Sequence, residues 1–236
     1  MADAGIIGIV TGLDFEARSL RAAARRSGMD GRVRIMASGP GPAAARRCAE
    51  ALAGEGCGLL LSMGLAGGLA PDLPAGAAVF ADRVQDAGGA RHAADAAWHA
   101  RLMALMQDWP MRPVAGGMLS LETPVSTVTA KARHHAETGA LAVDMESLGV
   151  AEAAAARGCP FLVARIVADP AQRAIPPAAL AGMLAGGGVD PVAVLRALVR
   201  RPRDLPGVLA LARDSRAARR ALGRFGELFL PLLLTG

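Results

Sequence analysis

The sequence contains few of the residues that some functional classes need. Aromatic residues make up 3% of the 236 residues, and tyrosine is absent. Because proteins hold single-stranded nucleic acid largely by stacking bases on aromatic rings, we expect no nucleic-acid partner. The three cysteines, Cys48, Cys57 and Cys159, form no CxxC pair. This predicts reduced thiols in a cytoplasmic protein rather than a disulfide framework or a zinc site.

Targeting segments and long apolar runs are also missing. The first ten residues have no basic region, so we expect no signal peptide. No stretch provides about 20 apolar residues without charge, so no membrane span is predicted. The four histidines do not have the spacing of metal ligands, and we expect neither a metal ion nor another cofactor.

The apolar residues that are present predict an α/β fold. They account for 53% of the chain, which allows a large core, and the length fits one domain. Short apolar runs alternate with amphipathic segments. We expect strands at 5–10, 32–39, 58–64, 77–85, 114–122, 141–144 and 160–169, and helices within 11–26, 40–54, 93–107, 126–138 and 146–157. This alternation predicts three layers around a mainly parallel sheet.

Acidic and glycine residues gather where the predicted strands end. Ligands bind at the carboxyl ends of parallel strands in such folds. Each of these signals alone is compatible with a tight turn, but several at separate strand ends indicate one ligand site. The signals are Glu16, "SGPG" at 38–41, "GLAGGL" at 64–69, the acids Asp144 and Glu146, and Asp169. Most of "GLAGGL" belongs to a glycine-rich turn that we expect at 65–76, after the strand that ends at Gly64.

Asp169 and Arg165 share one predicted strand and require an explanation. Burial would raise the pKa of Asp169 and enable it to donate a proton; alternatively, it is a turn residue before Pro170. Four strand residues span about 13 Å, so Arg165 and Asp169 should not pair directly. We expect Glu146 to neutralise Arg165; the alternative is a solvated arginine on an edge strand. Asp144 can cap the helix that follows it, so one acid of this pair should be structural and the other functional.

Together, the motifs resemble the nucleoside phosphorylase and nucleosidase superfamily, especially the methylthioadenosine/adenosylhomocysteine nucleosidases. In chain order they are "GIIG" followed by Glu16, "SGPG", "GLAGGLAP", "AVDMES" and "VARIVADP". The resemblance implies a mixed sheet surrounded by helices and cleavage of an N-glycosidic bond. It implies that Glu146 binds the ribose hydroxyls, Met145 packs on the sugar, Asp169 acts at the purine N7, and Glu16 positions water.

Further binding residues are predicted around these acids. Arg165 should steer one of the carboxylates. The glycine-rich segments allow close approach of backbone to a ligand. The resemblance places Pro124 and Val125 where relatives have residues that pack against the purine. The further binding residues predicted are Gly39, Leu65, Ala66, Gly67 and Val125.

The nucleophile and the substrate leave alternatives open. Phosphorolytic relatives hold phosphate with an arginine before the glycine segment, often with a serine or threonine in it, where this chain has Ser62 and Leu65. This favours water. Ala168 replaces a serine that many nucleosidases have beside the purine aspartate. Phosphorolysis and a methylthioadenosine or adenosylhomocysteine substrate remain alternatives.

The C-terminal part, residues 170–236 of the expected single domain 1–236, resembles the hopanoid-associated phosphorylase group. This implies removal of adenine from adenosylhopane, an adenine nucleoside with a hydrophobic 5′ substituent, in hopanoid side-chain biosynthesis. Phosphorolysis would instead give phosphoribosylhopane. The superfamily resemblance also implies a homodimer.

The same part suggests a membrane contact. Nine arginines lie between Arg196 and Arg224 among Leu, Val and Ala. Such a segment can lie at an anionic membrane surface, here the inner membrane, and the run 228–234 would add apolar contact. The alternative is two amphipathic helices packed on the core. A protein of another class, a non-catalytic membrane-surface binder, is the remaining alternative.

Overall fold

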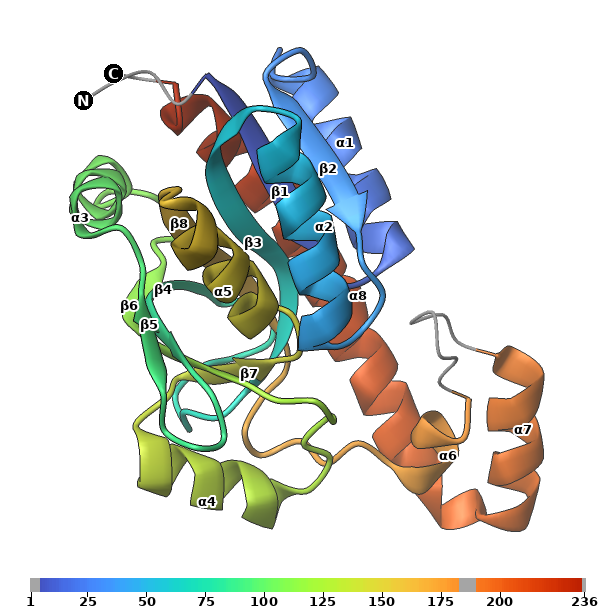
Figure 1. Cartoon of the computed structure of the whole chain (residues 1–236). Helices are drawn as coiled ribbons and strands as arrows, with labels where there is room; N and C mark the ends of the chain where they lie inside the picture. Colours follow the sequence, from blue (N-terminus) through green and yellow to red (C-terminus); the bar gives the residue numbers. More distant parts are fainter. Residues whose placement is uncertain (1–4, 183–189, 235–236) are drawn as a thin grey trace.

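The computed structural model describes residues 5–182 and 190–234 as one sheet covered by helices (Figure 1). The strands are β1 (Ile6–Thr11), β2 (Val33–Ala37), β3 (Cys57–Gly68), β4 (Ala78–Gln85), β5 (Arg91–Ala93), β6 (Val114–Ser120), β7 (Ala142–Asp144) and β8 (Phe161–Asp169). The helices are α1 (Asp14–Arg26), α2 (Pro42–Gly54), α3 (Ala96–Leu105), α4 (Val128–Thr138), α5 (Ser147–Arg157), α6 (Pro177–Leu180), α7 (Pro191–Arg200) and α8 (Leu205–Leu232), with the 3₁₀ turn η1 (Pro202–Asp204) before α8.

The sheet is mixed and mostly parallel, which confirms the predicted fold class. Its strand order is β2-β1-β3-β7-β6-β4-β5, and β8 pairs with both β3 and β4. Three pairs are antiparallel: β3 with β7, β4 with β5, and β4 with β8. Because β8 is bonded on both sides, the alternative of an edge strand for Arg165 is wrong.

Two helical layers bury the two faces of the sheet. Successive side chains of a strand point to opposite faces. Leu59 and Leu61 of β3 therefore pack in the core that also contains residues of α1, α3 and α8, whereas Leu60 packs in the core that contains residues of α2 and α5. Covering both faces explains why the strands read as continuous apolar runs.

β3 is longer than the sequence indicated. The prediction that this strand ends at Gly64 and gives way to a turn is wrong for residues 65–68. Gly67 pairs with Asp169 of β8 and with Val143 of β7, so the backbone stays in the ladder. Glycine in a strand often marks the close approach of another group. A Cβ atom on Gly64 would lie 2.8 Å from Arg165 Nη1.

The end of the chain belongs to the core. Phe229, Leu230 and Leu233 are buried against the sheet, so these three side chains of the run 228–234 pack in the core, whereas Leu228 is 47% exposed. In the described part of the chain, no helix is long and apolar enough to cross a membrane. β5 was not predicted, since its three residues, Arg-His-Ala, follow no apolar pattern.

Candidate active site

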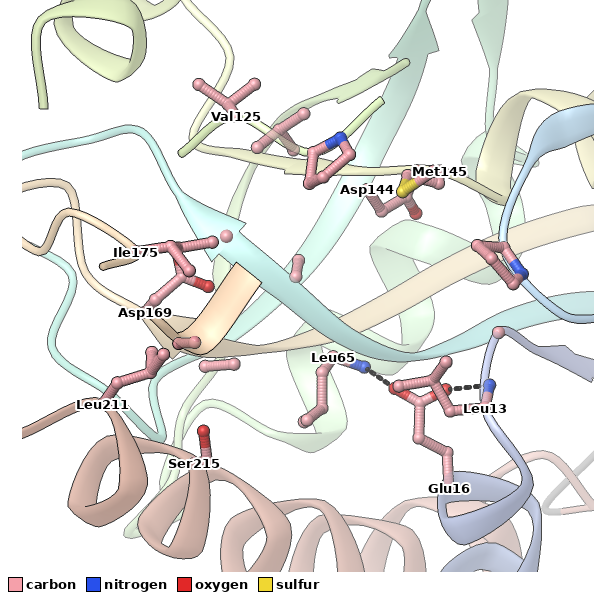
Figure 2. Close-up of a pocket in the computed structure, with 18 of the residues that line it drawn as sticks. Leu13, Glu16, Leu65, Val125, Asp144, Met145, Asp169, Ile175, Leu211 and Ser215 are labelled. Carbon is pink, nitrogen blue, oxygen red and sulfur yellow. Dashed lines mark hydrogen bonds between the residues drawn. The ribbon is translucent and has the colours of Figure 1, made fainter. Parts of the chain in front are cut away.

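A cavity of about 590 Å³ opens at the carboxyl ends of the strands (Figure 2). Eight of the ten residues predicted for the site line it: Glu16, Leu65, Ala66, Gly67, Val125, Met145, Glu146 and Asp169. Gly39 does not, because Pro40 is the residue of the "SGPG" turn that reaches the cavity. Arg165 is 1% exposed and lies behind the wall.

Glu16 connects α1 to β3. Its Oε2 atom accepts a hydrogen bond from the N–H of Leu13 at 2.9 Å, and Oε1 accepts one from the N–H of Leu65 at 2.8 Å (Figure 2). The first bond satisfies a free N–H at the start of the helix. Burial raises the pKa of Glu16, against the opposing effect of Arg165. The carboxylate is therefore held in one orientation before any ligand arrives.

Arg165 neutralises the two acids of the "DMES" motif. Its Nε lies 2.8 Å from Asp144 Oδ2, and its Nη2 lies 3.3 Å from Glu146 Oε2. Nη2 also donates to Ser62 Oγ at 2.7 Å. Ser62 is thus fully buried beside the arginine rather than facing the cavity. The expected pairing of Arg165 with Glu146 is found, and Asp144 is a second partner.

Asp144 and Glu146 have different surroundings. Asp144 Oδ1 accepts from the N–H of Ser147 at 3.2 Å, and Oδ2 accepts from the Ser147 hydroxyl. Asp144 therefore supports the start of α5. Glu146 lines the cavity, and Gly12 leaves it room, since a Cβ on Gly12 would lie 2.8 Å from Glu146 Oε1. Burial raises the pKa of Glu146 to about 8, with Arg165 opposing the shift and the neighbouring acids adding to it.

Lys131 of α4 is a site residue that the sequence reasoning missed. It is fully buried and forms an ion pair with Asp169 Oδ2. Its ammonium group also donates to the main-chain oxygens of Asp169 at 3.1 Å, Pro170 at 3.0 Å and Arg173 at 3.0 Å. The available signal was compositional: Lys131 is the only lysine in a chain that otherwise uses arginine.

Asp169 keeps a raised pKa in spite of this cation. Burial raises the pKa of Asp169 to about 6, and the charge and hydrogen bond of Lys131 oppose the rise. Asp214 of α8 adds to it. Asp169 lines the cavity, so a carboxyl group that titrates near neutral pH faces the ligand space. Figure 2 shows Asp169 and Glu16 on different sides of that space.

The C-terminal helices form a wall that no motif indicated. Most of its side chains are apolar: Ile175, Ala179, Val194, Val208, Leu211 and Ala212. Ser215, Arg216 and Arg219 of α8 continue it, and the Arg219 guanidinium lies 3.8 Å from the centre of the Phe15 ring. Figure 2 shows Leu211 and Ser215 on α8 at this side of the cavity.

The lining combines groups for acid–base chemistry with a large apolar surface. Four carboxyl groups, those of Glu16, Asp144, Glu146 and Asp169, line one space, and two buried cations lie beside them. Within residues 5–182 and 190–234, no cluster of His, Cys, Asp or Glu side chains has three or more members placed to hold a metal ion.

Sequence comparison connects the chain to a family of enzymes. The family model of the phosphorylase superfamily matches residues 13–182. A futalosine hydrolase of Streptomyces coelicolor is 35% identical over 156 residues, which cover 58% of this chain and 66% of that enzyme. The matched region is thus slightly less than two thirds of the relative's length.

Solved structures share the fold. A 5′-methylthioadenosine/S-adenosylhomocysteine nucleosidase of Helicobacter pylori superimposes with a TM-score of 0.68 at 15% identity, covering 98% of this chain and 97% of that one. The native futalosine hydrolase of the same species gives 0.68 at 14% identity, covering 98% and 96%. The family model spans the chain from Leu13, which bonds Glu16, to beyond Asp169, and the chain belongs to the phosphorylase superfamily.

Proposed function

We propose that the protein hydrolyses the N-glycosidic bond of an adenine nucleoside with a large apolar 5′ group. The expected substrate is adenosylhopane, and the products are adenine and ribosylhopane. The observation that carries the proposal is one cavity that combines four carboxyl groups with an apolar wall. Membership of the superfamily and the relatives named as a futalosine hydrolase and a methylthioadenosine nucleosidase support the reaction class.

Asp169 assists departure of the base. When the C1′–N9 bond breaks, its electron pair moves onto adenine, and a proton from Asp169 at N7 neutralises the charge. A carboxyl group whose pKa is about 6 holds this proton in a useful fraction of molecules near neutral pH. Lys131 then stabilises the carboxylate that remains.

Glu146 and Met145 hold the sugar. The Glu146 carboxyl group faces the cavity beside Met145 and can bond both ribose hydroxyls. Arg165 fixes its position from behind at 3.3 Å. This arrangement orients C1′ relative to Asp169, and correct orientation lowers the barrier by removing the entropy of alignment.

Glu16 orients and deprotonates the attacking water. Its two oxygens are fixed by the N–H groups of Leu13 and Leu65. Water adds to C1′ as the base leaves, and its proton passes to Glu16. Burial raises the pKa of Glu16, which makes it a better proton acceptor, and the charge of Arg165 opposes this rise. Because Arg165 also holds Glu146 from behind, Arg165→Ala should lower activity, and unchanged activity would contradict this role.

The C-terminal wall supports the choice of substrate. A ribose bound at Glu146 has its 5′ carbon free to point to a surface of Leu, Val and Ala side chains from α6 to α8. Burial of apolar surface contributes about 25 cal/mol per Å². A triterpene would thus gain far more binding free energy there than the methylthio group of methylthioadenosine.

Adenine release tests the proposal directly. It is measured with adenosylhopane, methylthioadenosine and futalosine, each with and without phosphate. We expect release from adenosylhopane without phosphate and a loss of about 10²–10⁴-fold in kcat for Asp169→Asn. If adenine is released from none of the three nucleosides, the proposed reaction is contradicted. A preference for methylthioadenosine would agree with the proposed reaction but contradict the proposal that the substrate has a large 5′ group.

Phosphorolysis at the same site is the second candidate, and two arginines favour it. Arg216 and Arg219 line the cavity, so a cationic group is available although Ser62 replaces the arginine of phosphorolytic relatives. Phosphate-dependent release that is lost in Arg216→Gln or Arg219→Gln would support this candidate over hydrolysis.

A further inference from the structure

Exposed apolar side chains are concentrated at one place in the fold. In the described residues, nine large hydrophobic side chains are exposed, and five of them lie between residues 192 and 209: Val192, Leu195, Val199, Leu205 and Leu209. We call α7, η1 and the first two turns of α8 the α7–α8 tip. Figure 1 shows it extending beyond the sheet, away from α1 and α2.

α7 has a regular exposed stripe. Val192, Leu195 and Val199 follow the i, i+3, i+7 spacing that places side chains on one face of a helix. They are 58%, 63% and 77% exposed, and no residue of α7 is buried. α7 therefore presents this face outward instead of burying it against the rest of the chain.

The α7–α8 tip is basic, since it contains four arginines, Arg196, Arg200, Arg201 and Arg203, and one carboxylate, Asp204. It belongs to a longer C-terminal segment that carries the net charge of the molecule. Residues 190–234 contain nine arginines and four carboxylates, a net charge of +5, which equals the formal charge of the whole chain. The remaining residues of the chain therefore carry equal numbers of positive and negative charges. Arg196 and Arg200 border the apolar stripe on α7, and both are exposed. In the described part of the chain, none of the nine arginines pairs with a carboxylate.

We propose that the α7–α8 tip docks on an anionic lipid surface. Apolar side chains bordered by unpaired arginines match a bilayer whose headgroups are negative and whose acyl chains begin a few ångströms below. A nucleic acid could neutralise the arginines, but its phosphate backbone would leave the apolar stripe exposed to water. A protein partner of matching shape would need acidic groups around an apolar groove, which is a more specific requirement than an anionic bilayer imposes.

The tip also adjoins the cavity. Val194 and Val208 line the cavity, and their chain neighbours Leu195 and Leu209 are exposed on the tip. Docking would place this wall of the cavity near the bilayer, so an apolar substituent could pass between them with little exposure to water. This last step rests on the proposed function, whereas docking itself does not.

Vesicle flotation tests the docking. The full chain is mixed with vesicles of phosphatidylcholine alone or of phosphatidylcholine with phosphatidylglycerol. We expect binding about tenfold tighter or more to the anionic vesicles, weakened by added salt. Equal binding to both vesicle types, or binding to neither, would overturn the proposal.

Matched variants localise the contact. Arg196→Glu with Arg200→Glu should weaken binding to anionic vesicles by about tenfold or more. Arg25→Glu with Arg47→Glu changes the net charge equally on exposed parts of α1 and α2 and should leave most of the binding. Equal losses in both double variants would show that only total charge matters and would overturn a specific tip.

The apolar stripe has its own variant. Leu195→Asp with Val199→Asp should weaken vesicle binding, and Leu105→Asp, an exposed leucine on α3, should not. Because no residue of α7 is buried, these changes leave the core intact. If wild type instead self-associates without vesicles and the double variant is monomeric by sedimentation, the stripe is a protein interface and lipid docking is rejected.

The outcome for docking is independent of that for the reaction. Asp169→Asn lacks the proposed proton donor but keeps the tip, and we expect it to bind vesicles like wild type. Vesicle binding without adenine release would reject the reaction alone. Adenine release without vesicle binding would reject the docking alone.

Discussion

Lys131 and Arg165 are buried cations that lie beside carboxyl groups of the cavity. Each is fixed by several oxygen atoms, and each contacts its acid from the side away from the ligand space. Removing one partner of a buried pair leaves an uncompensated charge. These cations therefore control both the position and the protonation of acids to which we assign chemistry.

The effect of Lys131 on protonation gives a test by pH. In the proposed mechanism Asp169 acts in its protonated form, so activity should decline as pH rises above about 6. The charged groups facing Asp169 are Lys131, which lowers its pKa, and Asp214, which raises it. In Lys131→Met the lowering effect is lost, the pKa of Asp169 rises, and the decline in kcat/KM should move to higher pH.

The pH profile separates this role from a loss of folding. We expect Lys131→Met to have a lower maximal rate as well, because its bonds to three main-chain oxygens are lost. Arg133→Met alters an exposed cation on the same helix and should retain the wild-type profile. A Lys131→Met profile with an unshifted decline would contradict the assignment.

At the scale of elements, α2 and α5 pack unusually closely. A Cβ atom on Gly149 of α5 would lie 1.9 Å from the Pro42 carbonyl oxygen at the start of α2. Gly149→Ala must separate the two helices. We expect the free energy of unfolding to fall by about 1–3 kcal/mol, measured by chemical denaturation.

Gly54 provides the matched control for this contact. It is the last residue of α2, and a Cβ atom there meets nothing within 4 Å. Gly54→Ala should leave the free energy of unfolding unchanged or raise it by less than about 1 kcal/mol. Equal destabilisation by both substitutions would show that helix separation is not the cause.

The α8 wall can be tested by filling it. Ala212 lines the cavity, so Ala212→Phe should obstruct a large 5′ group. We expect kcat/KM to fall about tenfold or more for adenosylhopane, which corresponds to a loss of about 1.4 kcal/mol in transition-state stabilisation. The value for adenosine should change little. Ala217→Phe adds the same group on an exposed part of α8 outside the cavity and serves as control. If kcat/KM falls equally for adenosylhopane and adenosine, the 5′ group does not bind beside Ala212.

At the scale of the whole molecule, the buried acids should make the protein less stable as pH rises. The folded state raises the pKa of Asp169 to about 6 and that of Glu146 to about 8. Between about pH 4 and pH 8 it therefore holds protons that the unfolded chain has released. Stability falls with pH wherever the folded state binds more protons.

Denaturation at several pH values measures this dependence. We expect the free energy of unfolding to decrease from about pH 5 to about pH 8, and Glu146→Gln to flatten the decrease above pH 6. Glu137→Gln, at an exposed site on α4, should leave the slope unchanged. A slope that is the same in wild type and Glu146→Gln would contradict the raised pKa.

The sequence by itself determined the α/β architecture, its family and most of the lining acids. Strands buried on both faces must be apolar throughout, so runs such as Leu59–Leu61 identify them without reference to neighbours. The acids at strand ends, Glu16, Glu146 and Asp169, follow from the rule that such ends meet at one edge. These signals are local in the chain.

Only the tertiary structure decided which groups surround these acids. Lys131 lies 38 residues before Asp169 on a helix whose own pattern does not mark it, and it is selected because it reaches a buried carboxylate. β3 continues through Gly68 because two other strands pair with it. The apolar pattern of the run 228–234 suits either a bilayer or a core, and packing on the sheet places Phe229, Leu230 and Leu233 in the core. Partners distant in sequence determine these features, so no local pattern can encode them.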